Sequence, residues 1–233
     1  MSIVLKSESK IIVALDYSNE DEALNFIKKV NPELCKLKIG KELFTVAGPQ
    51  FVEKIVAMGF DVFLDLKFHD IPNTVMKACH AASELGVWMV NVHALGGKTM
   101  MQAAKEGVSH SSTKLIAVTI LTSMGQEDLN QIGIETDVKD QVVNLARLAN
   151  DAGLDGVVCS AKEVSILREN LGNDFLLVTP GIRPAGNETS DQKRVMTPRE
   201  AVDTGSSYLV IGRPITQSES PIDTLEMILL NIV

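Results

Sequence analysis

Short apolar runs rich in Val, Ile and Leu alternate along the chain with longer amphipathic stretches. Eight runs have the length of buried strands, and they occupy residues 11–16, 34–40, 61–67, 88–94, 114–121, 156–160, 175–181 and 208–214. Amphipathic segments of helical length lie between them, such as 19–30, 74–86, 138–153 and 161–172, and several end at a glycine that suits a helix C-cap. A strand followed by a helix, repeated along the whole chain, predicts a parallel sheet.

The number of these units indicates how the sheet is arranged. Parallel strands buried on both faces read as continuous apolar runs, and eight strand–helix units in 233 residues fit a closed (β/α)8 barrel, a TIM barrel. We expect one domain over residues 1–233. An open doubly wound sheet is the alternative, because periodicity does not show closure. The polar segment 185–196 is the longest irregular connection and suits a mobile loop over a ligand.

Composition and charge narrow the possible partners. The net charge of -8 argues against a broad nucleic-acid surface, which needs clustered Lys and Arg, whereas a few local cations suffice for a small anionic ligand. No stretch approaches 18 uninterrupted apolar residues, so we expect no membrane span. Cys35, Cys79 and Cys159 fit no metal-ligand spacing and are expected as buried thiols, which favours a reducing, cytoplasmic location.

Polar residues close several of the otherwise apolar strands. They are Asp16, Lys38, Asp65, Lys67, His93 and Thr122. In a barrel the loops at the carboxyl ends of the strands build the active site, and polar groups there cost free energy unless they are paired or used. These positions are therefore the candidate site.

Strand alternation places Asp65 and Lys67 on the same face, pointing into the barrel mouth. Lys38 on the neighbouring strand can reach the same space, and Asp70 follows in the next loop, which predicts an alternating cluster of Lys, Asp, Lys and Asp. An ordinary ion-pair network is the alternative. We favour function, because four converging charges are expensive to hold together.

The last two predicted strands carry a second signal. Residues 178–184 and 210–216 both contain Gly and Arg directly after an apolar run, where barrels commonly bind phosphate through backbone N–H groups. Gly181 and Gly212 would allow close approach of an oxyanion, and Arg213 would add a planar donor. The alternative is that both glycines only serve turns. His69 and His93 lack partners at metal spacing and are expected to be structural.

The residues 65–74, DLKFHDIPNT, resemble the signature of the bacterial orotidine 5′-phosphate decarboxylase family. The similarity continues at residues 14–16, 37–45, 121–124, 179–184, 191–198 and 211–215. The resemblance implies a TIM barrel that decarboxylates orotidine 5′-monophosphate to uridine 5′-monophosphate in pyrimidine biosynthesis, without a cofactor or metal.

The resemblance also implies residue roles. Lys67 would be the proton donor, Asp65 would lie beside the substrate carboxylate, and Lys38 and Asp70 would complete the charged network. Asp70 and Thr74 would cross the interface of a homodimer with shared active sites. The implied substrate contacts are Asp16 and Lys38 at ribose hydroxyls, Thr122 at the pyrimidine edge, and Arg183, Gln192, Gly212 and Arg213 at the phosphate, with Gln192 also reaching the base.

Two other functions stay open. An enzyme similar to 3-hexulose-6-phosphate synthase would share the Asp-x-Lys-x-x-Asp pattern but would use Mg²⁺ to stabilise an enediolate. A barrel without catalytic activity would only bind a nucleotide phosphate.

Overall fold

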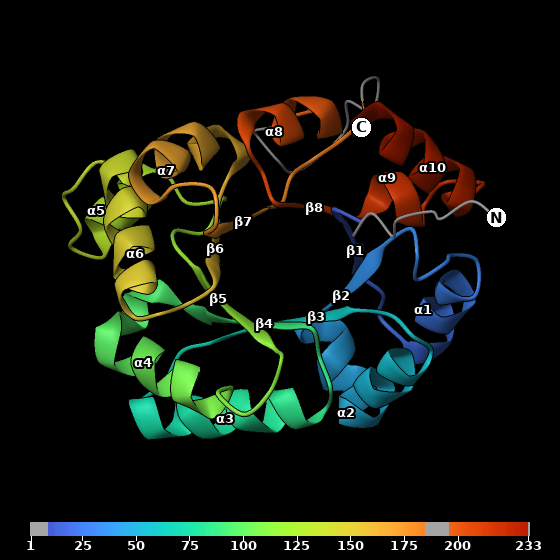
Figure 1. Ribbon diagram of the computed structural model, residues 1–233, viewed down its shortest axis with the longest axis horizontal. Coiled ribbons are helices and arrows are strands. Elements are labelled where there is room, and N and C mark those ends of the chain that lie inside the picture. The colour runs from blue at the N-terminus through green and yellow to red at the C-terminus, as the bar shows by residue number, and fades with distance from the viewer. Residues whose placement is uncertain (1–8, 185–195, 233) are drawn as a thin grey trace.

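The strands form a closed parallel barrel surrounded by helices (Figure 1). The computed structural model describes residues 9–184 and 196–232. The strands follow the order β1 to β8, and β1 pairs with β8 to close the ring. The predicted (β/α)8 barrel is confirmed, and the open sheet is excluded. The boundaries 1–233 stay a prediction, because both ends of the chain lie outside the described residues.

The strands lie within or close to the predicted runs. They are β1 (Ile11–Leu15), β2 (Lys36–Gly40), β3 (Val62–Phe68), β4 (Met89–His93), β5 (Lys114–Val118), β6 (Gly156–Val158), β7 (Leu176–Thr179) and β8 (Tyr208–Ile211). The α-helices are α1 (Glu20–Ile27), α2 (Lys41–Ala57), α3 (Pro72–Glu84), α4 (Gly97–Gly107), α5 (Gln126–Gln131), α6 (Val138–Asp151), α7 (Val164–Leu171), α8 (Pro198–Thr204), α9 (Arg213–Thr216) and α10 (Pro221–Ile232). Short 3₁₀ turns, η1 (Ala94–Gly96) and η2 (Ala161–Glu163), precede α4 and α7.

Local signals explain where several helices begin. Asn19 and Asp137 cap α1 and α6 by accepting hydrogen bonds from backbone N–H groups of the first turn. Pro72 occupies the first turn of α3, where its missing N–H has no cost. These caps fix the helix starts next to the carboxyl ends of the strands, where the polar residues gather.

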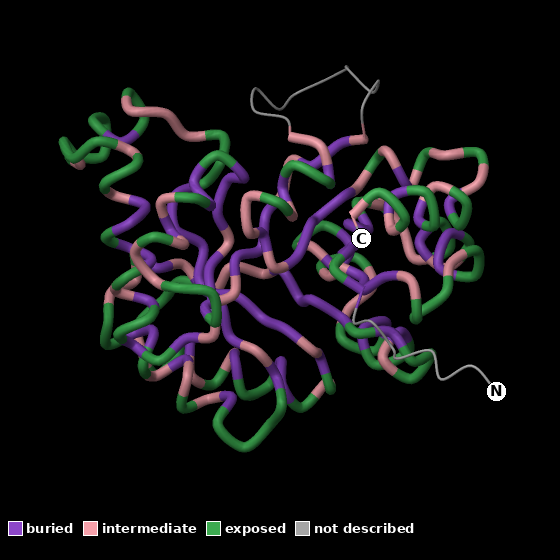
Figure 2. Tube along the Cα trace, turned by 45° about the horizontal axis from the view of Figure 1, so that its top comes forward, coloured by how far each residue is buried: buried purple, intermediate pink, exposed green. Residues whose placement is uncertain are grey.

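Two hydrophobic layers hold the barrel together, and the strands between them are almost entirely buried (Figure 2). The inner layer fills the barrel with side chains from every second strand position, among them Ile12, Phe63 and Met89. The outer layer lies between strands and helices and includes Leu37 and Leu64. The alternation of Phe63 inward and Leu64 outward is the one that the sequence predicts for β3.

The structure also bears on the predictions about the cysteines and about membrane spans. The three cysteines are free and buried, as expected. Among the described helices, none is both long enough and apolar enough to cross a bilayer.

Gly156 provides a test of the barrel's packing. A Cβ at this position of β6 would lie 2.3 Å from the backbone oxygen of Leu176 on β7, so Gly156→Ala should force the two strands apart. We expect it to lower the free energy of unfolding in urea by about 1–3 kcal/mol. Gly125→Ala is the matched control, since its Cβ would meet nothing closer than 3.9 Å. Equal stability of the two variants would contradict the packing described.

Candidate active site

A cavity of about 300 Å³ opens at the carboxyl ends of the strands. Its lining comes from most of the barrel's circumference: Ala14, Asp16, Lys38, Phe63, Asp65, Lys67, Val118, Ile120, Leu121, Thr122, Val158, Pro180, Gly181, Ile182, Arg183, Val210, Gly212, Arg213 and Pro214. The floor is apolar and belongs to the inner layer, whereas charged groups stand on both sides of the mouth. The cavity can therefore bury an apolar ring while binding charged substituents at its edges.

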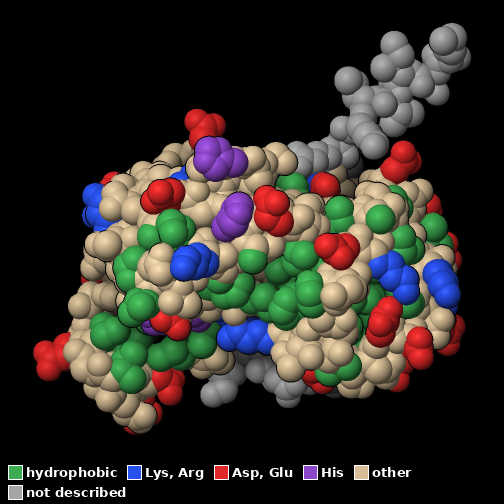
Figure 3. Space-filling view, turned by 90° about the horizontal axis from the view of Figure 1, so that it is seen from below, with side chains coloured by type: hydrophobic (Ala, Val, Ile, Leu, Met, Phe, Trp, Pro, Cys, Tyr) green, Lys and Arg blue, Asp and Glu red, His purple; other side chains and the backbone are tan. Residues whose placement is uncertain are grey.

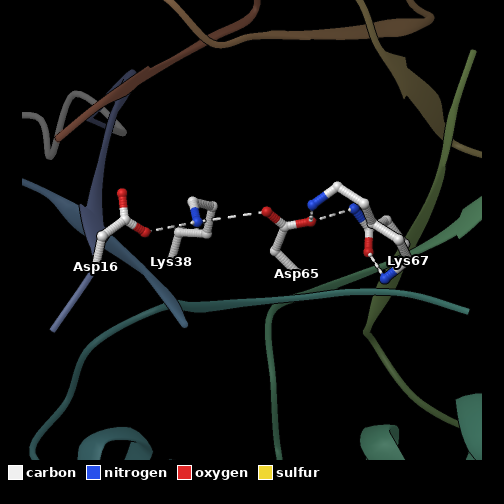
Figure 4. Close-up of polar contacts among 5 residues, drawn as sticks. Asp16, Lys38, Asp65 and Lys67 are labelled. Atoms are coloured by element: carbon white, nitrogen blue, oxygen red, sulfur yellow. Dashed lines mark hydrogen bonds and ion pairs between the residues drawn. The ribbon is translucent and has the colours of Figure 1, made fainter. Parts of the chain in front are cut away.

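Four charged side chains of alternating sign form a continuous row along one side of this cavity (Figure 4). Lys38 Nζ lies 3.5 Å from Asp16 Oδ1 and 3.4 Å from Asp65 Oδ2. Lys67 Nζ donates to Asp65 Oδ1 at 2.6 Å. The carboxylate of Asp65 thus lies between two ammonium groups.

The register of the first strands produces this row. Asp65 of β3 lies opposite Gly40 of β2, and Lys38 lies opposite Phe63, so Lys38 and Asp65 are staggered on adjacent strands and face the same interior. Gly40 also leaves space for Lys38, since a Cβ at residue 40 would lie 3.3 Å from Lys38 Nζ. The predicted inward orientation of Lys38, Asp65 and Lys67 agrees with their place in the cavity wall.

Asp65 is held as a carboxylate although it is largely buried. Burial, the largest single influence, would raise the pKa of Asp65, whereas the positive charges of Lys38 and Lys67 lower this pKa. Hydrogen bonds from Lys67 and Asn91 act in the same direction. The net result is a pKa of Asp65 below its ordinary value, so the site holds a fixed negative charge beside Lys67.

Asn91 is a member of this site that the sequence analysis did not identify. Its side chain is fully buried in β4, donates to Asp65 Oδ1 at 2.7 Å, and accepts a hydrogen bond from the Lys67 backbone N–H at 2.8 Å. The available signal was an amide within the apolar run 88–94, two residues before His93 and therefore on the same strand face.

Asp70 lies outside the row, contrary to the cluster expected from its position in the sequence. It is exposed in the loop before α3, where its carboxylate accepts from the backbone N–H of Ile71. The second acid of the row within one chain is Asp16. Thr74, in the first turn of α3, is also exposed. The roles of Asp70 and Thr74 across a dimer interface stay predictions.

The edge of the cavity formed after β7 and β8 carries the predicted anion-binding residues, and it lies next to the Asp16 end of the row because β8 pairs with β1. Gly181 follows β7 with a φ of 79°, a left-handed conformation that favours glycine. The buried Arg183, together with Gly212 and Arg213 after β8, completes this edge, and Thr122 after β5 contributes to the same wall. Gln192 and most of the predicted loop 185–196 lie outside the described residues.

The rings of His69 and His93 contact each other in a tilted arrangement, with centroids 5.6 Å apart and an interplanar angle of 39°. Among the residues that the structure describes, no group of three or more His, Cys, Asp or Glu side chains could hold a metal ion. Partial burial lowers the pKa of His93 to about 4, and nearby His69, Lys41 and Lys67 add to this effect. His93 is therefore neutral near pH 7.

The fold and the cavity together define a class: a (β/α)8-barrel enzyme whose cavity holds an alternating charge row and a candidate anion-binding edge. The family model described as "Orotidine 5′-phosphate decarboxylase / HUMPS family" matches residues 9–228. The chain belongs to this family, as the sequence motifs predict.

Individual relatives agree with this assignment. The orotidine 5′-phosphate decarboxylase of Pseudoalteromonas atlantica is 55% identical over 228 residues, covering 97% of this chain and 99% of the relative. The orotidine 5′-phosphate decarboxylase of Haemophilus ducreyi is 58% identical over 224 residues, covering 95% of this chain and 97% of the relative. The crystal structure of orotidine 5′-phosphate decarboxylase from Lactobacillus acidophilus has a TM-score of 0.88 and 42% identity, covering 97% of this chain and 99% of that chain.

The lowered pKa of His93 predicts a pH dependence of stability. The unfolded state binds a proton at the ordinary pKa of 6.5, whereas the folded state binds it only near pH 4, so protonation favours unfolding between these values. The contribution of His93 to stability is complete above about pH 6.5 and is lost as the pH falls towards 4. His93→Gln should therefore flatten the decrease in unfolding free energy over this range, measured by urea titrations.

The exposed His110 supplies the control for this experiment. His110→Gln should keep the wild-type dependence on pH. If His93→Gln and His110→Gln gave the same slope, the proposed environment of His93 would be wrong.

Proposed function

We propose that this chain decarboxylates orotidine 5′-monophosphate to uridine 5′-monophosphate, the pyrimidine-biosynthetic reaction after which its family is named. The observation that carries the proposal is the ammonium group of Lys67, held 2.6 Å from Asp65 in the wall of a cavity that also contains a candidate phosphate-binding edge. The named relatives extend over nearly the whole chain, which supports the same reaction.

The decarboxylation requires a positive charge beside C6 of the pyrimidine ring. Loss of carbon dioxide from C6 of the pyrimidine leaves an electron pair in the plane of the ring, where the ring cannot delocalise it. A fixed ammonium beside C6 stabilises this charge as it forms and then delivers a proton to the same carbon. In this proposal Lys67 is the donor and Asp65 lies beside the departing carboxylate, while Lys38 and Asp16 hold the ribose hydroxyls. The reaction needs no cofactor or metal.

Phosphate binding contributes at a distance from C6. We assign the phosphate to Arg183, Gly212 and Arg213, and the pyrimidine edge to Thr122, because they line the same cavity as the charge row and match the family motifs. Gln192 belongs to the same assignment through the family resemblance alone. Binding energy from the phosphate can offset the cost of bringing the substrate carboxylate close to Asp65.

A homodimer with shared active sites is part of the proposal. The segments that follow β2, β3 and β4 expose large hydrophobic side chains, among them Val46 in α2, Ile71 at the start of α3 and Leu95 in η1. Figure 3 shows the molecule from below the view of Figure 1, on the side where α2, α3 and α4 lie. Hydrophobic side chains gather in the middle of this face. An apolar surface next to Asp70 and Thr74 suits an interface that would carry these two residues to the partner's cavity. The free, buried cysteines support the predicted cytoplasmic location.

The synthase-like alternative receives no support of its own. The matching family model includes both activities in its name, but the curated relatives at 55% to 58% identity carry the decarboxylase name. Activity that survives a chelator would separate the decarboxylase from a Mg²⁺-dependent lyase.

The central test is the Lys67→Ala variant. Without the ammonium, the carbanion loses both its stabilising charge and its proton donor, so we expect turnover to fall by roughly 10³-fold or more. The loss of orotidine 5′-monophosphate is followed by ultraviolet absorbance. Lys29→Ala, in the exposed turn after α1, is the control and should retain activity. A folded Lys67→Ala protein with the wild-type rate would refute the mechanism.

Subunit mixing tests the shared sites. Dimers reassembled from Lys67→Ala and Asp70→Ala chains should regain about a quarter of wild-type activity, because half the dimers are mixed and each mixed dimer has one intact site. Asp65 and Lys67 belong to the same chain's site, so a mixture of Lys67→Ala and Asp65→Ala chains should regain none. Equal recovery in both mixtures, or in neither, would contradict Asp70 crossing the interface.

A further inference from the structure

The register between β3 and β4 is broken next to the charged row. Leu64 pairs with Val90 and Phe68 pairs with Val92, so β3 advances four residues while β4 advances two. Asn91 is the single residue of β4 that faces this irregular segment. An irregularity of this kind removes backbone groups from the ladder, and a buried N–H that loses its ladder partner needs another acceptor.

Lys67 lies within the irregular segment and has an unusual backbone. Its φ is 53°, and it is the one non-glycine residue with positive φ in the described chain. A residue with a Cβ adopts this conformation at a cost and keeps it only where its surroundings hold it. The Asn91 side chain supplies such a hold, because Asn91 Oδ1 accepts from the Lys67 N–H at 2.8 Å.

The hydrogen bonds also fix which way the amide of Asn91 points. The Lys67 N–H can only donate, so the amide oxygen must face it, and the amide nitrogen then faces Asp65 Oδ1 at 2.7 Å. Asp65 Oδ1 consequently receives hydrogen bonds from both Asn91 Nδ2 and Lys67 Nζ. One amide thereby connects the backbone of the proton donor to the carboxylate that orients its ammonium.

We propose that Asn91 is a positioning residue for decarboxylation, whose amide holds the left-handed backbone of Lys67 and the carboxylate of Asp65 in a single arrangement. The inference rests on the proposed function of Lys67. Asn91 is fully buried and does not line the cavity, so it acts through these two residues and does not touch the substrate.

The variant Asn91→Asp isolates the donor half of the amide. It has nearly the same size and keeps an acceptor for the Lys67 N–H, but it places a second carboxylate against Asp65. Two carboxylates at hydrogen-bond distance need a shared proton. At high pH they repel and Asp65 leaves its position, whereas protonation of the pair at lower pH restores an O–H donor towards Asp65.

We therefore expect the kcat of Asn91→Asp to depend on pH differently from the kcat of the wild type. At about pH 8 we expect kcat of Asn91→Asp to fall by roughly tenfold or more, with KM changed by less than about threefold, because the phosphate edge is untouched. The ratio of variant to wild-type kcat should rise as the pH is lowered towards about 5.5. Asn91→Leu, which removes both hydrogen bonds, should lose kcat without recovery at low pH.

The matched control is Thr113→Val. Thr113 is also a buried polar residue of the barrel, and its hydroxyl donates to the backbone oxygen of Val87 at 2.8 Å, away from the cavity. A role limited to stability predicts that Thr113→Val and Asn91→Asp lower the unfolding midpoint but keep the wild-type pH profile. Hydrogen exchange of the Lys67 N–H gives a readout independent of activity, and should be slow in wild type and Asn91→Asp but fast in Asn91→Leu.

The outcomes separate this inference from the proposed function. A wild-type protein that never consumes orotidine 5′-monophosphate refutes the function. If the wild type is active but Asn91→Asp keeps the wild-type kcat and pH profile, only the role of Asn91 is overturned. The same conclusion follows if Asn91→Asp changes KM alone, or if this variant unfolds at pH 8. If Asn91→Leu does not fold, the Asn91→Asp profile decides the question.

Discussion

The site depends on one buried carboxylate, that of Asp65, between two ammonium groups. A buried charge is expensive unless it is neutralised and hydrogen-bonded, and Asp65 satisfies both conditions through Lys38, Lys67 and Asn91. Because each of these groups comes from β2, β3 or β4, the electrostatic balance requires that the three strands keep their register. The geometry of the charges and the closure of the barrel are therefore coupled.

The barrel supplies the rigidity that this arrangement needs. Inner-layer side chains such as Phe63 pack directly beneath the charged row, and the outer layer fixes the same strands against the helices. Charges on such strands cannot relax as they would on a loop in water. A site of this kind stabilises developing negative charge without reorganising at the moment of reaction, which is the property that cofactor-free decarboxylation demands.

The two parts of the cavity wall have different roles in the proposed reaction. The charged row comes from residues in or directly after β1, β2 and β3, whereas the candidate anion-binding edge comes from residues after β7 and β8. In the proposed function, the charged row acts at the reacting carbon and the anion-binding edge holds the part of the substrate that does not react. This separation allows binding energy from the phosphate to be used at the carbon that loses its carboxylate. The irregular register between β3 and β4 lies beside Lys67, at the charged row.

The sequence by itself determined the class of fold and most of the cavity wall. Eight apolar runs separated by amphipathic segments require parallel strands covered by helices, and period-2 alternation is enough to place Asp65 and Lys67 inward. The residue types Gly181, Arg183, Gly212 and Arg213 indicated the anion-binding edge, because their chemistry depends on local backbone and charge. The family motif extended these local patterns to named roles.

Only the tertiary structure decided which charges meet. Sequence proximity placed Asp70 in the row, but Asp70 is exposed in the loop before α3, and Asp16, which follows the neighbouring strand β1, lies beside Lys38. The contact of Asn91 with Asp65 and the positive φ of Lys67 were likewise invisible, because both arise from a register shift between two strands. Periodicity specifies which face a side chain occupies, whereas the partner across the barrel depends on closure and register, which only the folded chain fixes.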